Sequence, residues 1–168
     1  MKKILFATVL LTIIGCQQNK IVFVDNVKLM DEYQEKVDME SKFKLMAETL
    51  NKKRDSISQA FQMEAQTFQT KADNMPEDQA QKEYGMLQQR GQLIGQQLQQ
   101  QEQQLQSTSQ IEMDSIISTV KKEIKAFGKD KGYTFILGGG EGGSVLYGIE
   151  AKNVTKEVLA ILNEKYKK

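Results

Sequence analysis

Residues 73–78, Asp73-Asn74-Met75-Pro76-Glu77-Asp78, separate two long segments that carry the same helical pattern. Asp73 or Asn74 can end one helix, and Pro76 suits the first turn of the next, where its missing N–H costs nothing. Because the connection is short, the two helices should run antiparallel. The segment therefore predicts a helical hairpin with its tip near residues 73–78.

The helical pattern extends far on both sides of this tip. Residues 27–72 contain no glycine or proline, and apolar residues recur every three or four positions there and again up to about residue 127. A stripe of this length is typical of a coiled coil. About 46 residues give an arm roughly 70 Å long. Folding the chain at 74–75 makes facing residue numbers sum to about 149, so Leu98 should face Leu50. The N-terminal stripe comprises Phe43, Ala47, Leu50, Ile57, Phe61, Ala65 and Phe68, with Arg54 as its one strong violation.

Short apolar segments predict a small β body in residues 21–26 and 128–168. Strands are expected over 21–24, 133–137 and 144–147. Three short strands and one helix bury too little surface to be stable alone, yet all three strands are strongly apolar. We therefore expect the bodies of several subunits to merge into one core, from which the hairpin arms, residues 27–127, project.

A glycine-rich segment, Gly138-Gly139-Gly140-Glu141-Gly142-Gly143, joins the second and third predicted strands. It formally contains G-x-G-x-x-G, but a predicted strand follows it instead of the helix N-terminus that binds phosphate. We interpret it as a hairpin turn. Further on, Thr155 can cap a final helix over residues 156–166.

The N-terminus is typical of a secreted protein. Lys2 and Lys3 precede an apolar run that is too short to span a bilayer and that ends in Gly15-Cys16. This ending resembles the lipobox of bacterial lipoproteins, which implies cleavage after residue 15 and acylation of Cys16. The alternative is an ordinary signal peptide with an incidental cysteine. Under the lipobox reading, residues 16–20 would form a lipidated tether. Gln17 in place of an aspartate after the cysteine favours the outer membrane over the inner.

The order of these elements resembles the Skp/OmpH family of periplasmic chaperones. The matching segments are 21–25 with Tyr33, 133–137 with 145–147, and Asn153-Val154-Thr155-Lys156-Glu157-Val158-Leu159. The resemblance implies an α+β fold with a coiled-coil hairpin on a β body that assembles into a trimeric barrel. It also implies an ATP-independent holdase in the periplasm that encloses unfolded outer-membrane β-barrel proteins between its arms. The alternative is a structural coiled-coil lipoprotein, a spacer or assembly subunit, without clients.

Composition excludes several other functions. The chain has no histidine, and Cys16 is its sole cysteine, so the usual catalytic triads and zinc sites are absent. We expect no catalytic residues, no metal and no cofactor. Without residues 1–15 the chain carries 21 basic and 22 acidic residues. Nucleic acid is therefore not an expected partner, since phosphate binding needs a clustered cationic face.

Candidate client-contacting residues are Met63, Phe68, Met75 and Met86. Flexible, polarizable methionines off the main stripe suit promiscuous binding, although burial between neighbouring arms or plain exposure explains them equally well. The glutamine-rich segment 88–106 is either a hydrogen-bonding wall for unfolded chains or a solvated helix face. Likewise Gly85, Gly91 and Gly95 either let the arm flex or, for Gly91 and Gly95, make room for Phe61 and Arg54.

Overall fold

The computed structural model describes residues 20–167, so the predicted signal peptide and Cys16 lie outside the described residues. This part of the chain divides into two compact units, which we call the body (residues 20–33 and 120–167) and the arm (residues 34–119). No helix in it combines the length and apolar character needed to cross a membrane. In chain order the elements are β1 (Ile21–Asp25), α2 (Asn26–Glu32), α3 (Gln34–Ala72), α4 (Glu77–Lys131), β2 (Phe135–Gly139), the 3-10 helix η2 (Glu150–Lys152) and α5 (Thr155–Tyr166).

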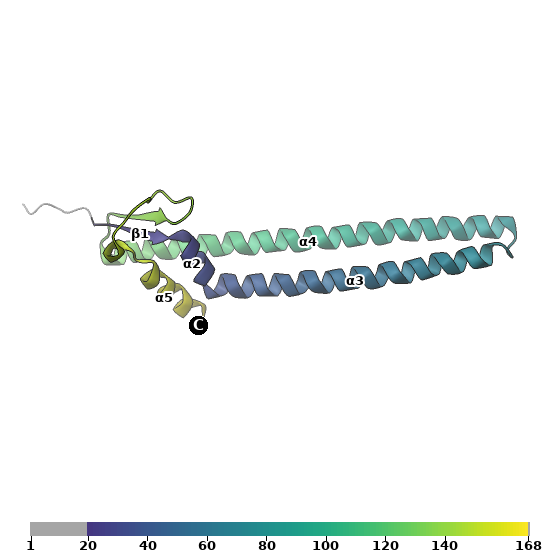
Figure 1. Ribbon diagram of the computed structural model, residues 1–168, viewed down its shortest axis with the longest axis horizontal. Coiled ribbons are helices and arrows are strands. Elements are labelled where there is room, and N and C mark those ends of the chain that lie inside the picture. Colours follow the sequence, from purple (N-terminus) through teal and green to yellow (C-terminus); the bar gives the residue numbers. More distant parts are fainter. Residues whose placement is uncertain (1–19, 168) are drawn as a thin grey trace, which may run out of the picture. The chain divides into compact units, whose positions relative to one another are not determined.

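The arm is an antiparallel pair made of α3 and the part of α4 before residue 120 (Figure 1). The first helix ends at Ala72 and the second begins at Glu77, which confirms the predicted tip. The Pro76 carbonyl accepts hydrogen bonds from the backbone N–H groups of Gln79 and Ala80, so the proline starts the second helix. Three ion pairs cross between the helices: Lys42–Glu112 (2.6 Å), Arg54–Glu102 (2.7 Å) and Glu64–Arg90 (2.6 Å).

The predicted apolar stripe forms the seam between these helices. Phe43 and Ile116 are buried, whereas Leu50, Phe61 and most other seam residues are half-buried. A two-helix coil leaves each seam residue open on its flanks, which explains the partial burial. Arg54, the predicted violation, is exposed and reaches across to Glu102.

The predicted register is wrong by about one helical turn. Contacting residues sum to between 152 and 156 instead of 149, as for Phe61 with Gly91 and Arg54 with Glu102. Helical side chains tilt toward the N-terminus of their own helix. Each contact therefore lies nearer that N-terminus than the Cα atom of the residue that makes it. In an antiparallel pair this tilt raises both residue numbers of a contacting pair.

The first helix is not continuous from residue 27, as the sequence predicted. Tyr33 breaks it between α2 and α3 with an extended backbone, φ −73° and ψ 115°. No glycine or proline marks this position, and the cause is tertiary: the Tyr33 side chain is 2% exposed. Its ring packs edge-on against that of Tyr166, 6.5 Å between centroids.

The body contains a two-stranded parallel sheet in which Ile21 pairs with Phe135 and Asp25 with Gly139. Val22 and Val24 face the core, while Ile21 and Phe135 on the alternate face are exposed. The second strand runs from Phe135 to Gly139, two residues later than predicted. The body's core also includes Leu29, Tyr33, Phe127, Val154, Val158 and Leu162.

Residues 144–147, predicted as a third strand, form only an isolated bridge at Val145 within the described chain. The Val145 N–H donates to the Gly138 carbonyl at 3.1 Å, and the backbone then leaves the sheet. The glycine-rich segment before it turns at Gly140 and Gly142, both with positive φ, but it is not the predicted hairpin, because the bridge between Gly139 and Val145 is parallel and no strand of the described chain follows. Beyond Val145 these residues pair with no strand of the described chain.

The C-terminal helix is present, but Thr155 does not cap it as predicted. The Asn153 side chain accepts a hydrogen bond from the Thr155 N–H at 3.1 Å. The Thr155 hydroxyl instead accepts one from the Asp25 N–H at 2.9 Å, which joins α5 to the end of β1. Thr155, which is 1% exposed, is instead the first residue of the helix, and its hydroxyl oxygen is used by β1 and not by the N–H groups of the first turn.

Candidate client-binding surface

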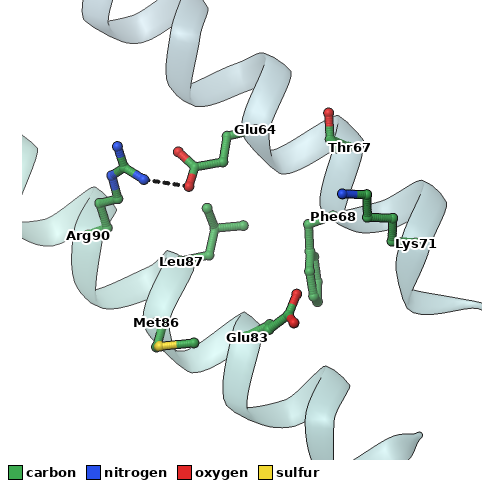
Figure 2. A pocket seen from close by; sticks show the side chains of 8 residues that line it. All are labelled: Glu64, Thr67, Phe68, Lys71, Glu83, Met86, Leu87 and Arg90. Atoms are coloured by element: carbon green, nitrogen blue, oxygen red, sulfur yellow. Dashed lines mark hydrogen bonds and ion pairs between the residues drawn. The ribbon is translucent and has the colours of Figure 1, made fainter. Parts of the chain in front are cut away.

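Two of the four predicted client-contacting residues meet in one cavity of the arm. Phe68 from α3 and Met86 from α4 line a cavity of about 480 Å³ near the tip, and Leu87 lies between the two helices there (Figure 2). The Phe68 ring is half-buried and lies 6.1 Å from the Tyr84 ring, whereas Met86 is 61% exposed. The structure does not bring Met63 or Met75 into this cavity.

The rim of this tip cavity is charged. Glu64 and Arg90 form an ion pair across the two helices at 2.6 Å, as the dashed line in Figure 2 marks. Lys71 and Glu83 complete the rim, so two acidic and two basic side chains surround an apolar floor. The cavity can hold an apolar side chain while the rim remains neutral overall.

A second cavity of about 430 Å³ lies nearer the base of the arm. No charged side chain lines it; its lining consists of Met46, Leu50, Gln101, Gln104, Leu105 and Thr108. Two members of the glutamine-rich segment therefore serve as amide walls of a neutral, partly apolar groove. The other glutamines of residues 88–106 are exposed, as expected of a solvated helix face.

The two cavities occupy equivalent positions on one face of the helical pair. Phe68 lies eighteen residues from Leu50 in α3, and Leu87 lies eighteen residues from Leu105 in α4. Eighteen residues are five helical turns, or about 27 Å. The arm thus repeats one groove twice, first with a charged rim at the tip and then with an amide rim toward the base.

Several exposed apolar residues of the arm were not identified from the sequence. Leu45 is 64% exposed, Leu93 57% and Ile111 65%. The same spacing relates them, because Leu45 lies eighteen residues before Met63 and Leu93 eighteen before Ile111. This repeat was the signal in the sequence that could have revealed them. Single exposed apolar side chains are common on protein surfaces, so these residues do not by themselves define a binding site.

The chain is similar in sequence to one protein family and in structure to one of the solved proteins described below. A family model described as outer membrane protein (OmpH-like) matches residues 20–162. The chain belongs to the OmpH-like family. A solved structure from Caulobacter crescentus CB15, described as an OmpH-like outer membrane chaperone, has a TM-score of 0.78 at 14% identity. The match covers 90% of this chain and 88% of the Caulobacter chain. No curated protein is significantly similar in sequence.

Membership of the OmpH-like family confirms the predicted family and supports a chaperone-type function of the cell envelope in general terms. The similar structure confirms the predicted α+β fold of long helices with a small sheet. Within residues 20–167 no group of three potential metal-ligating side chains comes together.

The OmpH-like body carries a second apolar surface. Ile21, Phe135 and Leu137 on one face of the sheet are 41%, 56% and 39% exposed. In the segment after the glycine turn, Leu146 is 99% exposed and Tyr147 85%. Aromatic and branched side chains exposed in a row beside a short sheet are typical of a surface that another chain covers.

Proposed function

We propose that this OmpH-like protein is an ATP-independent holdase that binds unfolded outer-membrane β-barrel proteins in the periplasm. The observation that carries the proposal is the pair of equivalent grooves on the arm, at Phe68 and Leu87 and at Leu50 and Leu105. Each is shallow and open, as suits weak and exchangeable contacts. Many weak contacts isolate an unfolded chain without selecting one sequence.

The groove spacing fits the proposed client. An extended chain rises about 3.3 Å per residue, so about 27 Å corresponds to roughly eight residues. A transmembrane β-strand has about 9–11 residues with one apolar face. A single client strand laid along the arm can therefore place an apolar side chain in each groove at once.

We further propose that the holdase is a homotrimer joined through its bodies and anchored by a lipid on Cys16. The exposed apolar surface of the body, including Leu146 and Tyr147, supports assembly. The lipobox-like sequence Ile13-Ile14-Gly15-Cys16 supports the anchor. The family resemblance supplies the number of subunits, and the anchor is proposed for the outer membrane.

Binding to a fluorescently labelled outer-membrane barrel protein, measured by anisotropy, tests the proposal. We expect micromolar or tighter binding to the urea-denatured client and none to the same protein folded in detergent, without nucleotide. The alternative function, a structural coiled-coil spacer, requires binding to neither form. Binding to the folded barrel alone would also contradict the holdase.

A further inference from the structure

Charge is divided unevenly between the two units of the chain. The arm, residues 34–119, carries nine basic and thirteen acidic residues, a net charge of −4. The described residues of the body carry eleven lysines against nine acidic residues, a net charge of +2. A nearly neutral chain therefore consists of an acidic arm and a basic body.

The basic charge of the body is concentrated at the end of α4. Lys121, Lys125 and Lys129 recur every four residues, which places them on one side of the helix. All three are exposed, and no ion pair between described residues involves them. They line a cavity of about 320 Å³ to which no acidic side chain contributes.

The acidic residues of this helical segment do not neutralise the lysine row. Glu123 is 12% exposed and pairs with Lys165 of α5 at 2.5 Å. Asp130 lies on another side of the helix, with its own neighbour Lys131 at 3.9 Å. The row of Lys121, Lys125 and Lys129 thus presents an uncompensated positive surface.

The N-terminus of the described chain enters the body at this same surface. The Lys20 carbonyl accepts a hydrogen bond from the Thr134 N–H at 2.9 Å, and Thr134 lines the cavity beside the lysine row. Only residues 17–19 separate Lys20 from Cys16. At about 3.5 Å per residue, Lys20 lies at most roughly 14 Å from an acylated Cys16 along the chain.

We propose that Lys121, Lys125 and Lys129, together with Lys20, form a surface that binds anionic phospholipid headgroups. This inference rests on the proposed lipid anchor, which would hold the surface against the membrane. Exposed lysines attract anionic lipids only within about a Debye length, roughly 8–10 Å, and a tether of at most roughly 14 Å is short enough to let the surface reach that range. An anionic membrane attracts the basic body and repels the acidic arm, so the charges favour contact through the body.

Vesicle flotation of residues 16–168 with Cys16→Ser tests this surface in the absence of the acyl anchor. This chain lacks only the predicted signal peptide and keeps every residue that the structure describes. The vesicles are phosphatidylcholine alone and phosphatidylcholine mixed with phosphatidylglycerol. We expect binding to the mixed vesicles only, and its loss between about 0.1 M and 1 M salt, where the Debye length falls from about 10 Å to 3 Å.

Two triple variants with the same change in charge locate the binding. Lys121→Gln/Lys125→Gln/Lys129→Gln should weaken binding to the mixed vesicles on the order of 100-fold, because each lysine near an anionic surface contributes about fivefold. The control, Lys44→Gln/Lys52→Gln/Lys82→Gln, removes three exposed arm lysines and should bind within about twofold of the parent. Circular dichroism unfolding checks that both variants fold.

Three results would overturn the proposal: equal binding to neutral vesicles, equal losses in both triple variants, or displacement from vesicles by millimolar inorganic phosphate at constant ionic strength. The last would identify a soluble anion as the ligand. Suppression of client aggregation is measured on the same variants. It should not change in the body variant, so a failed holdase and a failed lipid surface give different patterns.

Discussion

The ring of Phe61 occupies the space in which a side chain on Gly91 would begin. A Cβ atom built on Gly91 would lie 2.9 Å from Phe61 Cζ. Gly91 is therefore a packing glycine that lets the two arm helices approach. Gly85 and Gly95 differ, because nothing lies within 4 Å of a Cβ at either position. The structure thus confirms the room made for Phe61 and excludes such a role for Gly95.

Replacing Gly85 or Gly95 with alanine should stabilise the arm. Each glycine in a helix interior costs about 1 kcal/mol relative to alanine, and the new methyl group meets open space. Chemical denaturation followed by circular dichroism measures the change. Gly91→Ala is the control, because the same gain in propensity is opposed by displacement of the Phe61 ring. A Gly95→Ala variant no more stable than Gly91→Ala would refute this distinction.

Replacing Thr155 with valine should destabilise the body by about 1–3 kcal/mol. Valine keeps the shape of threonine but leaves the Asp25 N–H without its acceptor in a site that is 1% exposed. Amide hydrogen exchange at Asp25 gives the specific readout: exchange should accelerate in Thr155→Val. Thr155→Ser retains the hydroxyl and should leave Asp25 protected. Equal exchange in the two variants would show that the hydroxyl is not the relevant acceptor.

The double variant Leu146→Ser/Tyr147→Ser should dissociate the proposed trimer without unfolding the subunit. These side chains are 99% and 85% exposed, so the fold of one chain does not depend on them. Size-exclusion chromatography with light scattering measures the assembly. Leu45→Ser/Ile111→Ser, which changes two exposed apolar residues of the arm, is the control and should remain a trimer. A trimer in both variants would remove residues 146–147 from the interface.

Met86→Ser should weaken client binding more than Met63→Ser does. Met86 lines the tip groove, whereas Met63 has similar exposure, 63% against 61%, but lies outside both grooves. Loss of about 1 kcal/mol of apolar contact corresponds to roughly fivefold weaker binding. Anisotropy with the denatured client measures the difference. If the double variant Met63→Ser/Met86→Ser binds like the parent, both methionines are excluded from the site.

The sequence predicts the two helices of the arm and the seam between them because the apolar residues recur regularly along both helices. Residues 73–78 locate the tip, and the seam through Phe43, Leu50 and Phe61 holds as predicted. Features set by tertiary contacts were not predictable. The break at Tyr33 depends on burial of its ring, and residues 144–147 pair with β2 at Val145 alone instead of forming a strand. The register was misjudged because it depends on the tilt of side chains along each helix.

For the candidate site, the search for methionines outside the apolar stripe identified Met86, which lines the tip groove. It also selected Met63, which lines neither groove. The grooves lie on one flank of the seam, where half-buried residues such as Leu50 and Leu105 contribute as much as exposed ones. Periodicity along a single helix does not reveal which residues of two helices share a groove. That information becomes available once the register is known, because both grooves then follow from the eighteen-residue repeat.

The most direct test of the central claim follows an unfolded outer-membrane barrel protein by light scattering after dilution from urea. The mature chain is present without nucleotide, and its size is measured in the same sample. We expect scattering to be suppressed at about one trimer per client. Unchanged scattering in the presence of a folded trimer would contradict the holdase and favour a structural coiled-coil protein.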